Sequence, residues 1–132
     1  MTLGVRALVL RDDHVWLVRH TYVDGWYLPG GGVERGETVR QALEKELREE
    51  GNIALIGEPE HVACMANFTT TDRDHVCYFI VRQFEQTVPY PPNREIAEGG
   101  WFPVTALPDG TTRATRARVT EFLSGGETPA NW

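Results

Sequence analysis

Two short hydrophobic runs near the start of the chain predict a β-hairpin. The β-favouring runs at 5–10 and 15–18 flank Asp12 and Asp13, which favour a turn between antiparallel strands. The segment 21–27 is polar and aromatic, and we expect it to be a loop.

The first helix is predicted between a glycine-rich segment and a helix-ending pair. Residues 28–32 read Leu-Pro-Gly-Gly-Gly, which excludes a regular helix there. Thr38 followed by Gln41 three residues later matches a capping box at a helix start. Gly51 and Asn52 tolerate the left-handed backbone that ends a helix.

The second half of the chain predicts broken strands, a loop and a closing helix. Strand-forming residues at 53–68 are interrupted by Gly57 and Pro59, and 76–84 forms a strong strand. The remaining segments are a loop at 87–98, a short strand at 101–102, a helix at 112–123 and a loose tail at 124–132. The buried side of that last helix is assigned to Ala114, Ala117, Val119, Phe122 and Leu123. These elements predict a mixed α/β domain.

Composition and charge narrow the classes of partner. The 132 residues fit one domain, 1–132, with 41% hydrophobic and 24% charged residues. A net charge of −6 argues against a broad electrostatic grip on nucleic acid, so no stable nucleic-acid partner is expected. A small phosphate ligand stays compatible, because a bound cation reverses the local field.

The chain shows no signal for a membrane or a zinc site. No apolar run approaches the ~20 residues of a membrane span, and residues 1–10 are too short and too polar at Arg6 for a secretory signal. We therefore expect a cytoplasmic protein. Cys64 and Cys77 lie in apolar stretches and are interpreted as small buried hydrophobes, since no CxxC pair or His/Cys cluster is evident.

Three glutamates of the first helix do not follow its hydrophobic pattern. At about 100° per residue, Val39, Leu43 and Leu47 fall within about 80° of one another and define the core side. Glu46 and Glu50 point almost into that side, and Glu49 lies just beside it. The ordinary alternative is a solvated charged face with i,i+4 pairs.

Buried, converging carboxylates require a positive partner. A carboxylate buried without one costs several kcal/mol at least, and three of them repel each other. Hard oxygen ligands suit Mg²⁺ or Mn²⁺ rather than zinc. A backbone carbonyl of the glycine run before the helix is a further neutral oxygen ligand, although the same glycines fit a simple tight turn.

Residues 31–53, GGVERGETVRQALEKELREEGNI, resemble the Nudix box, G-x5-E-x7-R-E-U-x-E-E-x-G-U with U a bulky aliphatic residue. The matching positions are Gly31, Glu37, Glu46, Leu47, Glu49, Glu50 and Ile53. Two positions depart from the pattern. Lys45 replaces an arginine that in the family braces the turn through the early glutamate, here Glu37, and lysine lacks the bidentate fork. Asn52 replaces a glycine and tolerates the same backbone region.

The resemblance implies a Nudix-type α/β/α sandwich with a mixed β-sheet and a divalent-metal site. It implies Mg²⁺, with Mn²⁺ as a possible substitute, held by the box glutamates and the Gly30 carbonyl. A further carboxylate usually comes from a late loop; on spacing we prefer Glu95, with Glu98 second.

The reaction implied is attack of water on a diphosphate linkage in a small nucleotide-like molecule. Glu49 and Glu50 would be the main metal ligands, and Glu46 a ligand or the general base. Nucleoside triphosphates, ADP-ribose and nucleotide sugars all remain candidate substrates. Two alternatives stand beside this interpretation: an inactive Nudix-fold module that binds a nucleotide or a partner, and an unrelated acidic α/β protein.

Four residues before the box are candidates for substrate binding. Arg19 and His20 end the second predicted strand and face the glycine loop. The resemblance suggests that one of them contacts a phosphate; the alternative is an ordinary strand-end charge. Tyr22 and Trp26 are aromatic groups suited to stacking on a base, although for Trp26 core packing is the stronger interpretation. Many relatives in the family are dimers, so a homodimer is possible.

Overall fold

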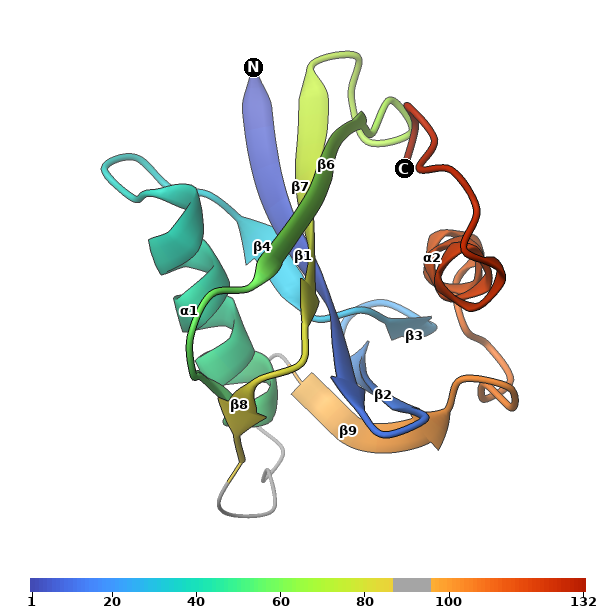
Figure 1. Ribbon diagram of the computed structural model, residues 1–132. Helices are drawn as coiled ribbons and strands as arrows, with labels where there is room; N and C mark the ends of the chain where they lie inside the picture. Colours follow the sequence, from blue (N-terminus) through green and yellow to red (C-terminus); the bar gives the residue numbers. More distant parts are fainter. Residues whose placement is uncertain (87–95) are drawn as a thin grey trace.

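A computed structural model describes residues 1–86 and 96–132, in which a mixed β-sheet lies between two helices (Figure 1). The elements are β1 (Thr2–Arg11), β2 (His14–His20), β3 (Trp26–Tyr27), β4 (Gly30–Gly32), α1 (Val39–Gly51), β5 (Ala54–Leu55), β6 (Glu60–Ala66), β7 (Asp74–Val81), β8 (Phe84–Glu85), β9 (Ile96–Pro103) and α2 (Arg113–Ser124). The predicted α/β/α sandwich with a mixed sheet is confirmed.

The sheet is mixed because β1 pairs with β7 in parallel, while its other pairings are antiparallel. The main strand order is β3-β2-β1-β7-β6, with β4 added to β1 and β9 added to β2. Strands β5 and β8 form a separate pair. This arrangement puts the glycine strand β4 beside β1 and next to α1, which positions the candidate site.

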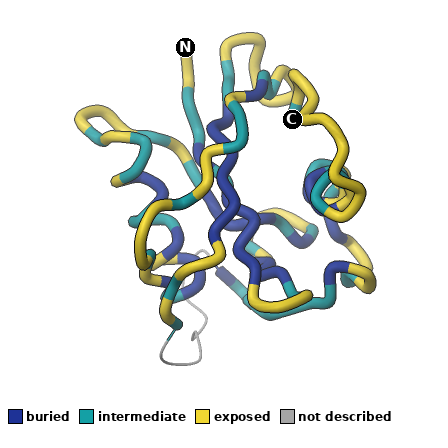
Figure 2. The backbone as a smooth tube through the Cα atoms, viewed as in Figure 1, coloured by how far each residue is buried: buried dark blue, intermediate teal, exposed yellow. Residues whose placement is uncertain are grey.

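Alternation along β1 divides the core into two layers. Val5, Ala7 and Val9 pack with α1, whereas Leu8 and Leu10 pack in the second cluster, which includes Val119 of α2. Figure 2 shows the buried backbone concentrated in the central strands between the helices. The hydrophobic positions of one strand therefore serve both faces of the sheet.

Helix α1 begins and ends as the sequence predicts. The Thr38 hydroxyl accepts a hydrogen bond from the Gln41 backbone N–H, and the Gln41 side chain accepts one from Thr38. Asn52 takes the left-handed conformation with φ 52° and closes the helix. Gly51 is still helical and lies close to Trp16, where a Cβ would come within 2.8 Å of the indole nitrogen.

The hairpin prediction is confirmed, and several other boundaries need correction. Asp12 adopts a positive φ of 54° in the turn between β1 and β2. The aromatic loop contributes strand β3, and the predicted strand 76–84 is divided into β7 and β8. Residues 87–95 lie outside the described part of the chain. Strand β9 begins at Ile96, so Glu98 lies in a strand rather than in a loop.

The end of the chain departs further from the sequence-based prediction. Leu123 was assigned to the buried side of the last helix, but 51% of it is exposed, whereas Arg118 of the same helix is buried. The Trp132 N–H donates to the Ala66 carbonyl, and the Arg118 guanidinium lies 4.8 Å from the Trp132 ring. The tail is therefore anchored at its end, so the prediction of a loose tail is wrong there. Neither helix of the described ranges is long and apolar enough to cross a membrane.

Two leucines test this description of the core. Leu43→Ala removes a fully buried side chain of α1 and should lower the free energy of unfolding by about 2–5 kcal/mol. Leu123→Ala is the matched control and should stay within about 0.5 kcal/mol of wild type. Urea denaturation measures both, and equal losses would contradict the assignment of Leu123 to the surface.

Candidate functional site

The glycine strand β4 pairs antiparallel with β1 and leaves no room for a side chain at Gly30. A Cβ on Gly30 would overlap the carbonyl oxygen of Val5, so only glycine fits at this position. The segment before it is fixed as well, because Ala7 N–H donates to the Pro29 carbonyl at 3.1 Å. The Arg6 guanidinium donates to the Leu28 carbonyl at 2.7 Å. These contacts therefore hold the glycine strand in a fixed position beside the end of α1.

Glu50 connects the end of α1 to the glycine strand β4. Its carboxylate accepts a hydrogen bond from the Gly30 backbone N–H at 2.9 Å, and the residue is only 3% exposed. The Glu50 carbonyl accepts a hydrogen bond from the Trp16 indole N–H at 3.1 Å. Burial of a carboxylate is unfavourable without such contacts, so Glu50 is held in one position by contacts at both ends.

Glu46 converges on the same strand from one helical turn earlier. A Cβ added to Gly31 would lie 2.6 Å from the Glu46 carboxyl group, so the missing side chain leaves the space that this carboxylate occupies. Glu46 is half-buried, whereas Glu49 is exposed. The structure thus brings two of the three predicted carboxylates against β4 and leaves the third on the solvent side of the helix end.

The electrostatics of this helix end favour a cation. Glu46 and Glu50 are like charges four residues apart on one helix face, an arrangement that is destabilising. Glu49 and Glu50 also lie in the last turn of α1, where the helix dipole disfavours negative charge. A divalent ion with hard-ligand preference, such as Mg²⁺ or Mn²⁺, fits these oxygen donors. Glu46, Glu49 and Glu50 are the residues that would hold it, with the Gly30 carbonyl as a predicted fourth donor.

The loop before α1 is braced by Glu37 and Lys45. The Lys45 ammonium lies 2.9 Å from the Glu37 carboxylate, which also accepts a hydrogen bond from the Glu34 backbone N–H at 2.9 Å. The Glu34 hydrogen bond and the Lys45 charge hold the pKa of Glu37 below its ordinary value, and the Glu37 contact raises the pKa of Lys45. Lysine therefore forms the contact that the family pattern gives to arginine.

Of the four predicted substrate residues, Arg19 and Tyr22 are exposed, His20 is half-buried and Trp26 lies in the core. Arg19 forms an ion pair with Glu98 at 2.9 Å, so the second choice for a late carboxylate ligand contacts a cationic side chain. Glu95, the first choice, lies outside the described residues. His20 lies 5.3 Å from the ring of Tyr22, which is exposed. Trp26 is only 8% exposed and packs against Phe102, which favours its structural role.

A cleft of about 590 Å³ adjoins β4. Its lining includes Arg6, Tyr27, Gly31, Gly32, Asn67, Thr112 and Thr115. These residues come from strands, a turn and α2, which are far apart in the sequence. Of the aromatic residues between 21 and 27, the cleft includes Tyr27, and none of the four predicted substrate residues lines it. Hydrophobic periodicity within one segment could not predict this cleft, because its lining residues come from several segments.

Comparison with known proteins agrees with this fold. The family described as NUDIX domain matches residues 1–123. An RNA pyrophosphohydrolase of Xylella fastidiosa is 40% identical over 56 residues, covering 42% of this chain and 27% of that protein. An uncharacterized Nudix hydrolase of Bacillus subtilis is 35% identical over 65 residues, covering 49% of this chain and 40% of that protein. The matches therefore span less than half the length of either relative.

Solved structures show the same fold over most of the chain. A MutT NUDIX hydrolase from Burkholderia pseudomallei superposes with a TM-score of 0.76 at 25% identity, covering 90% of this chain and 95% of that one. An ADP-ribose pyrophosphatase from Streptococcus suis gives 0.73 at 24% identity, with coverages of 92% and 91%. The layered fold and the carboxylate-bearing helix define a Nudix-type domain. This chain belongs to the Nudix family.

Gly31→Ala tests the space in which Glu46 lies. The new Cβ would displace the flexible Glu46 carboxylate rather than backbone, so the melting temperature should change little. Affinity for Mn²⁺, measured by calorimetry, should fall about tenfold or more, the range seen when ligand orientation is lost. Gly32→Ala is the control, because its Cβ meets nothing within 4 Å. Equal affinities of the two variants would contradict the placement of Glu46.

Glu37→Gln tests the brace through its pH dependence. The folded protein lowers the pKa of Glu37 from 4.5, so its stabilising contribution is complete above that value and is lost as pH falls through the folded pKa. Wild type should resist urea better than Glu37→Gln at pH 7, and the difference should shrink on acidification. Glu34→Gln is the control, since Glu34 is exposed and lies 3.7 Å from Lys45. A difference that does not change with pH would refute the brace.

Proposed function

We propose that this chain is a divalent-metal-dependent hydrolase that cleaves a diphosphate linkage in a small nucleotide-like molecule. The observation that carries the proposal is the pair of carboxylates, Glu46 and Glu50, packed against the glycine strand at the negative end of α1. Membership of the Nudix family supports the same reaction. A purely structural role would account for the Glu50 contact with Gly30 but not for a second carboxylate, Glu46, packed against the same strand.

The residues have distinct parts in the proposed reaction. A bound Mg²⁺ or Mn²⁺ supplies an activated water and neutralises charge on the phosphate oxygens. Glu50 holds one fixed position, because its carboxylate is hydrogen-bonded to Gly30. Glu49 is exposed beside it and would be a second carboxylate ligand. Glu46 completes the set as a ligand or as the base that accepts the proton of the attacking water.

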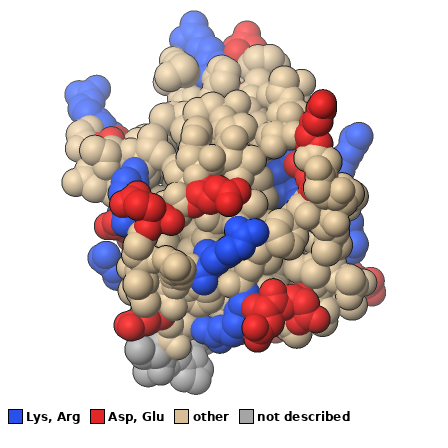
Figure 3. Space-filling view, in the orientation of Figure 1, with Lys and Arg blue, Asp and Glu red and all other residues tan. Residues whose placement is uncertain are grey.

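The substrate class follows from the charge and the cleft. On the face drawn in Figure 3, basic and acidic side chains are interspersed, and the net charge is −6. We therefore favour a small nucleotide derivative over long RNA. The cleft beside β4 combines Tyr27 with the polar side chains of Asn67 and Thr112, which suits a base and a sugar. Cytoplasmic location and a homodimer remain predictions of the sequence.

A substrate panel tests the proposal. Nucleoside triphosphates, ADP-ribose, nucleotide sugars and a 5′-triphosphorylated RNA oligonucleotide are incubated with Mg²⁺, Mn²⁺ or chelator, and released phosphate compounds are measured. One substrate class should be hydrolysed only with metal. Glu50→Gln and Glu49→Gln should each lower kcat by about 10²-fold or more, since a carboxylate at the reacting centre is lost.

Glu44→Gln is the matched control for these variants. Glu44 lies on the same helix but forms an i,i+4 ion pair with Arg40 at 2.8 Å, away from β4. It should retain nearly full activity. Turnover that survives loss of both Glu49 and Glu50 would place the active site elsewhere. Metal binding without turnover of any substrate would favour the inactive nucleotide-binding module.

A further inference from the structure

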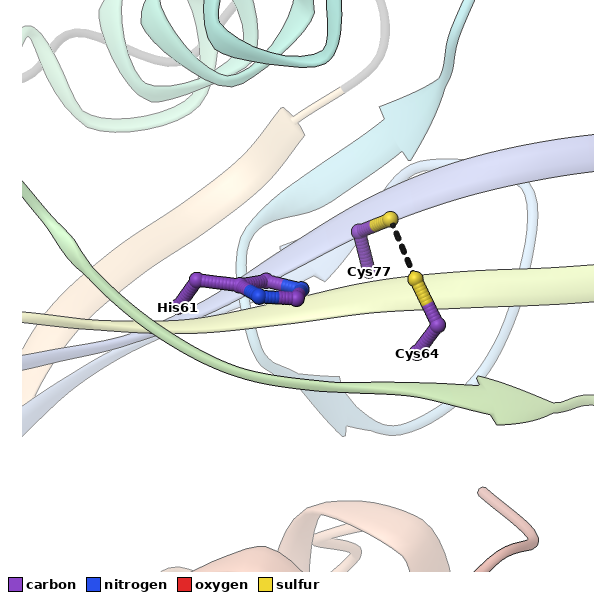
Figure 4. Close-up of side chains that lie close together, drawn as sticks. All are labelled: His61, Cys64 and Cys77. Carbon is purple, nitrogen blue, oxygen red and sulfur yellow. Dashed lines mark hydrogen bonds between the residues drawn. The ribbon is translucent and has the colours of Figure 1, made fainter.

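Three side chains that can bind a soft metal ion, those of His61, Cys64 and Cys77, meet on the face of the sheet that packs against α1. The Sγ atoms of Cys64 and Cys77 lie 2.9 Å apart on directly opposed positions of β6 and β7. The ligand atoms of these two cysteines and of His61 all lie within 4.8 Å of one another. Figure 4 shows the imidazole of His61 directed toward the two sulfur atoms. Among the described residues, it is the one group of at least three His, Cys, Asp or Glu residues whose ligand atoms lie this close together.

A β-bulge brings His61 to the side of the sheet where the cysteines lie. In a regular strand, residues three apart point to opposite faces. Here the register shifts between His61 and Ala63, so His61 pairs with Phe79 and Cys64 pairs with Cys77. Phe79 and Cys77 are two residues apart and belong to the same core layer. The inserted residue therefore re-aims His61 toward the cysteines, a function typical of bulges.

The surroundings of the cluster suit entry and retention of an ion. Strand β6 is the last strand of the main sheet order, and both His61 and Cys64 are exposed, whereas Cys77 is buried. The ring of His61 lies 5.1 Å from that of Phe79, which limits its orientation. An ion would enter from the solvent side and meet one buried and two accessible donors.

We propose that His61, Cys64 and Cys77 form a binding site for a soft metal ion of the zinc type. Thiolate and imidazole donors select such ions, whereas the carboxylates of α1 select Mg²⁺ or Mn²⁺. Binding releases the two thiol protons to solvent and leaves both sulfurs as metal-bound thiolates. Tetrahedral coordination at a Zn–S length of about 2.3 Å separates the sulfurs by roughly 3.8 Å, and rotation of the exposed Cys64 side chain supplies the extra distance.

The position of the histidine distinguishes a metal site from a simple cysteine pair. A disulfide between Cys64 and Cys77 makes no use of His61, whose ligand atom lies within 4.8 Å of those of the two cysteines. The convergence of all three donors is therefore better explained by metal coordination than by oxidation of the two cysteines.

Cobalt spectroscopy tests the site on the full chain. Reduced protein is titrated with Co²⁺ in excess Mg²⁺, which occupies the carboxylates of α1. One equivalent of Co²⁺ should produce a thiolate-to-cobalt charge-transfer absorption, which carboxylate ligands cannot give, and Zn²⁺ should abolish it. Zn²⁺ should also raise the melting temperature, because the ion links β6 to β7 in the folded state.

The variants distinguish the three-ligand site from its alternatives. Cys64→Ser replaces an exposed side chain, so it should fold normally and lose the absorption. His61→Ala should weaken Co²⁺ binding about tenfold or more, whereas His75→Ala, on the neighbouring strand, should bind like wild type. Absence of the absorption in reduced wild-type protein, or its full retention in Cys64→Ser or His61→Ala, would overturn the proposal. A pair that gives no free thiols before reduction and no cobalt binding afterwards would identify a disulfide instead.

Discussion

The hydrogen bond from the Gly30 N–H to the buried carboxylate of Glu50 fixes the relation between the sheet and the first helix. It requires the antiparallel pairing of β4 with β1, in which only glycine fits at position 30. It also requires the end of α1 to stay in place, which the Trp16 contact with the Glu50 carbonyl secures. A second contact secures the same end, because Gln86 donates to the Gly51 carbonyl at 2.7 Å.

The free-energy cost of this arrangement is the main support for the proposed cation site. Negative side chains at the carboxyl end of a helix oppose its dipole, and burial removes the water that would otherwise screen them. The fold nevertheless packs Glu46 and Glu50 against the same strand. Evolution for stability alone would favour a hydrophobic residue at such a buried position. These unfavourable electrostatics support the proposed metal site.

The proposed zinc-type site lies on another part of the sheet and uses donor atoms of a different chemical class. The α1 carboxylates are hard donors, whereas the cluster on β6 and β7 offers two sulfurs and one imidazole. Ion selectivity in proteins depends on such differences in donor type and geometry. Under the two proposals, one small domain carries two donor sets that select different ions. A glycine strand assembles the first set and a bulge assembles the second.

Local sequence patterns were sufficient for the features that depend on neighbours along the chain. The hairpin at Asp12 and the caps of α1 at Thr38 and Asn52 were predicted, because each is set by residues within a few positions. The sequence also singled out the three box glutamates, since helical spacing places Glu46 and Glu50 on the core side of the helix. The spacing overestimated the burial of Glu49, which the structure shows to be exposed.

Tertiary structure alone decided the features that join distant segments. Cys64 was predicted to be buried, but it is exposed, because β6 is the last strand of the main sheet order. The tail was predicted to be loose, but Trp132 is anchored on Ala66. The absence of a His/Cys motif in the sequence concealed the cluster of His61 with the two cysteines. Strand register and a single bulge created that cluster, and neither is encoded in the spacing of residues along one segment.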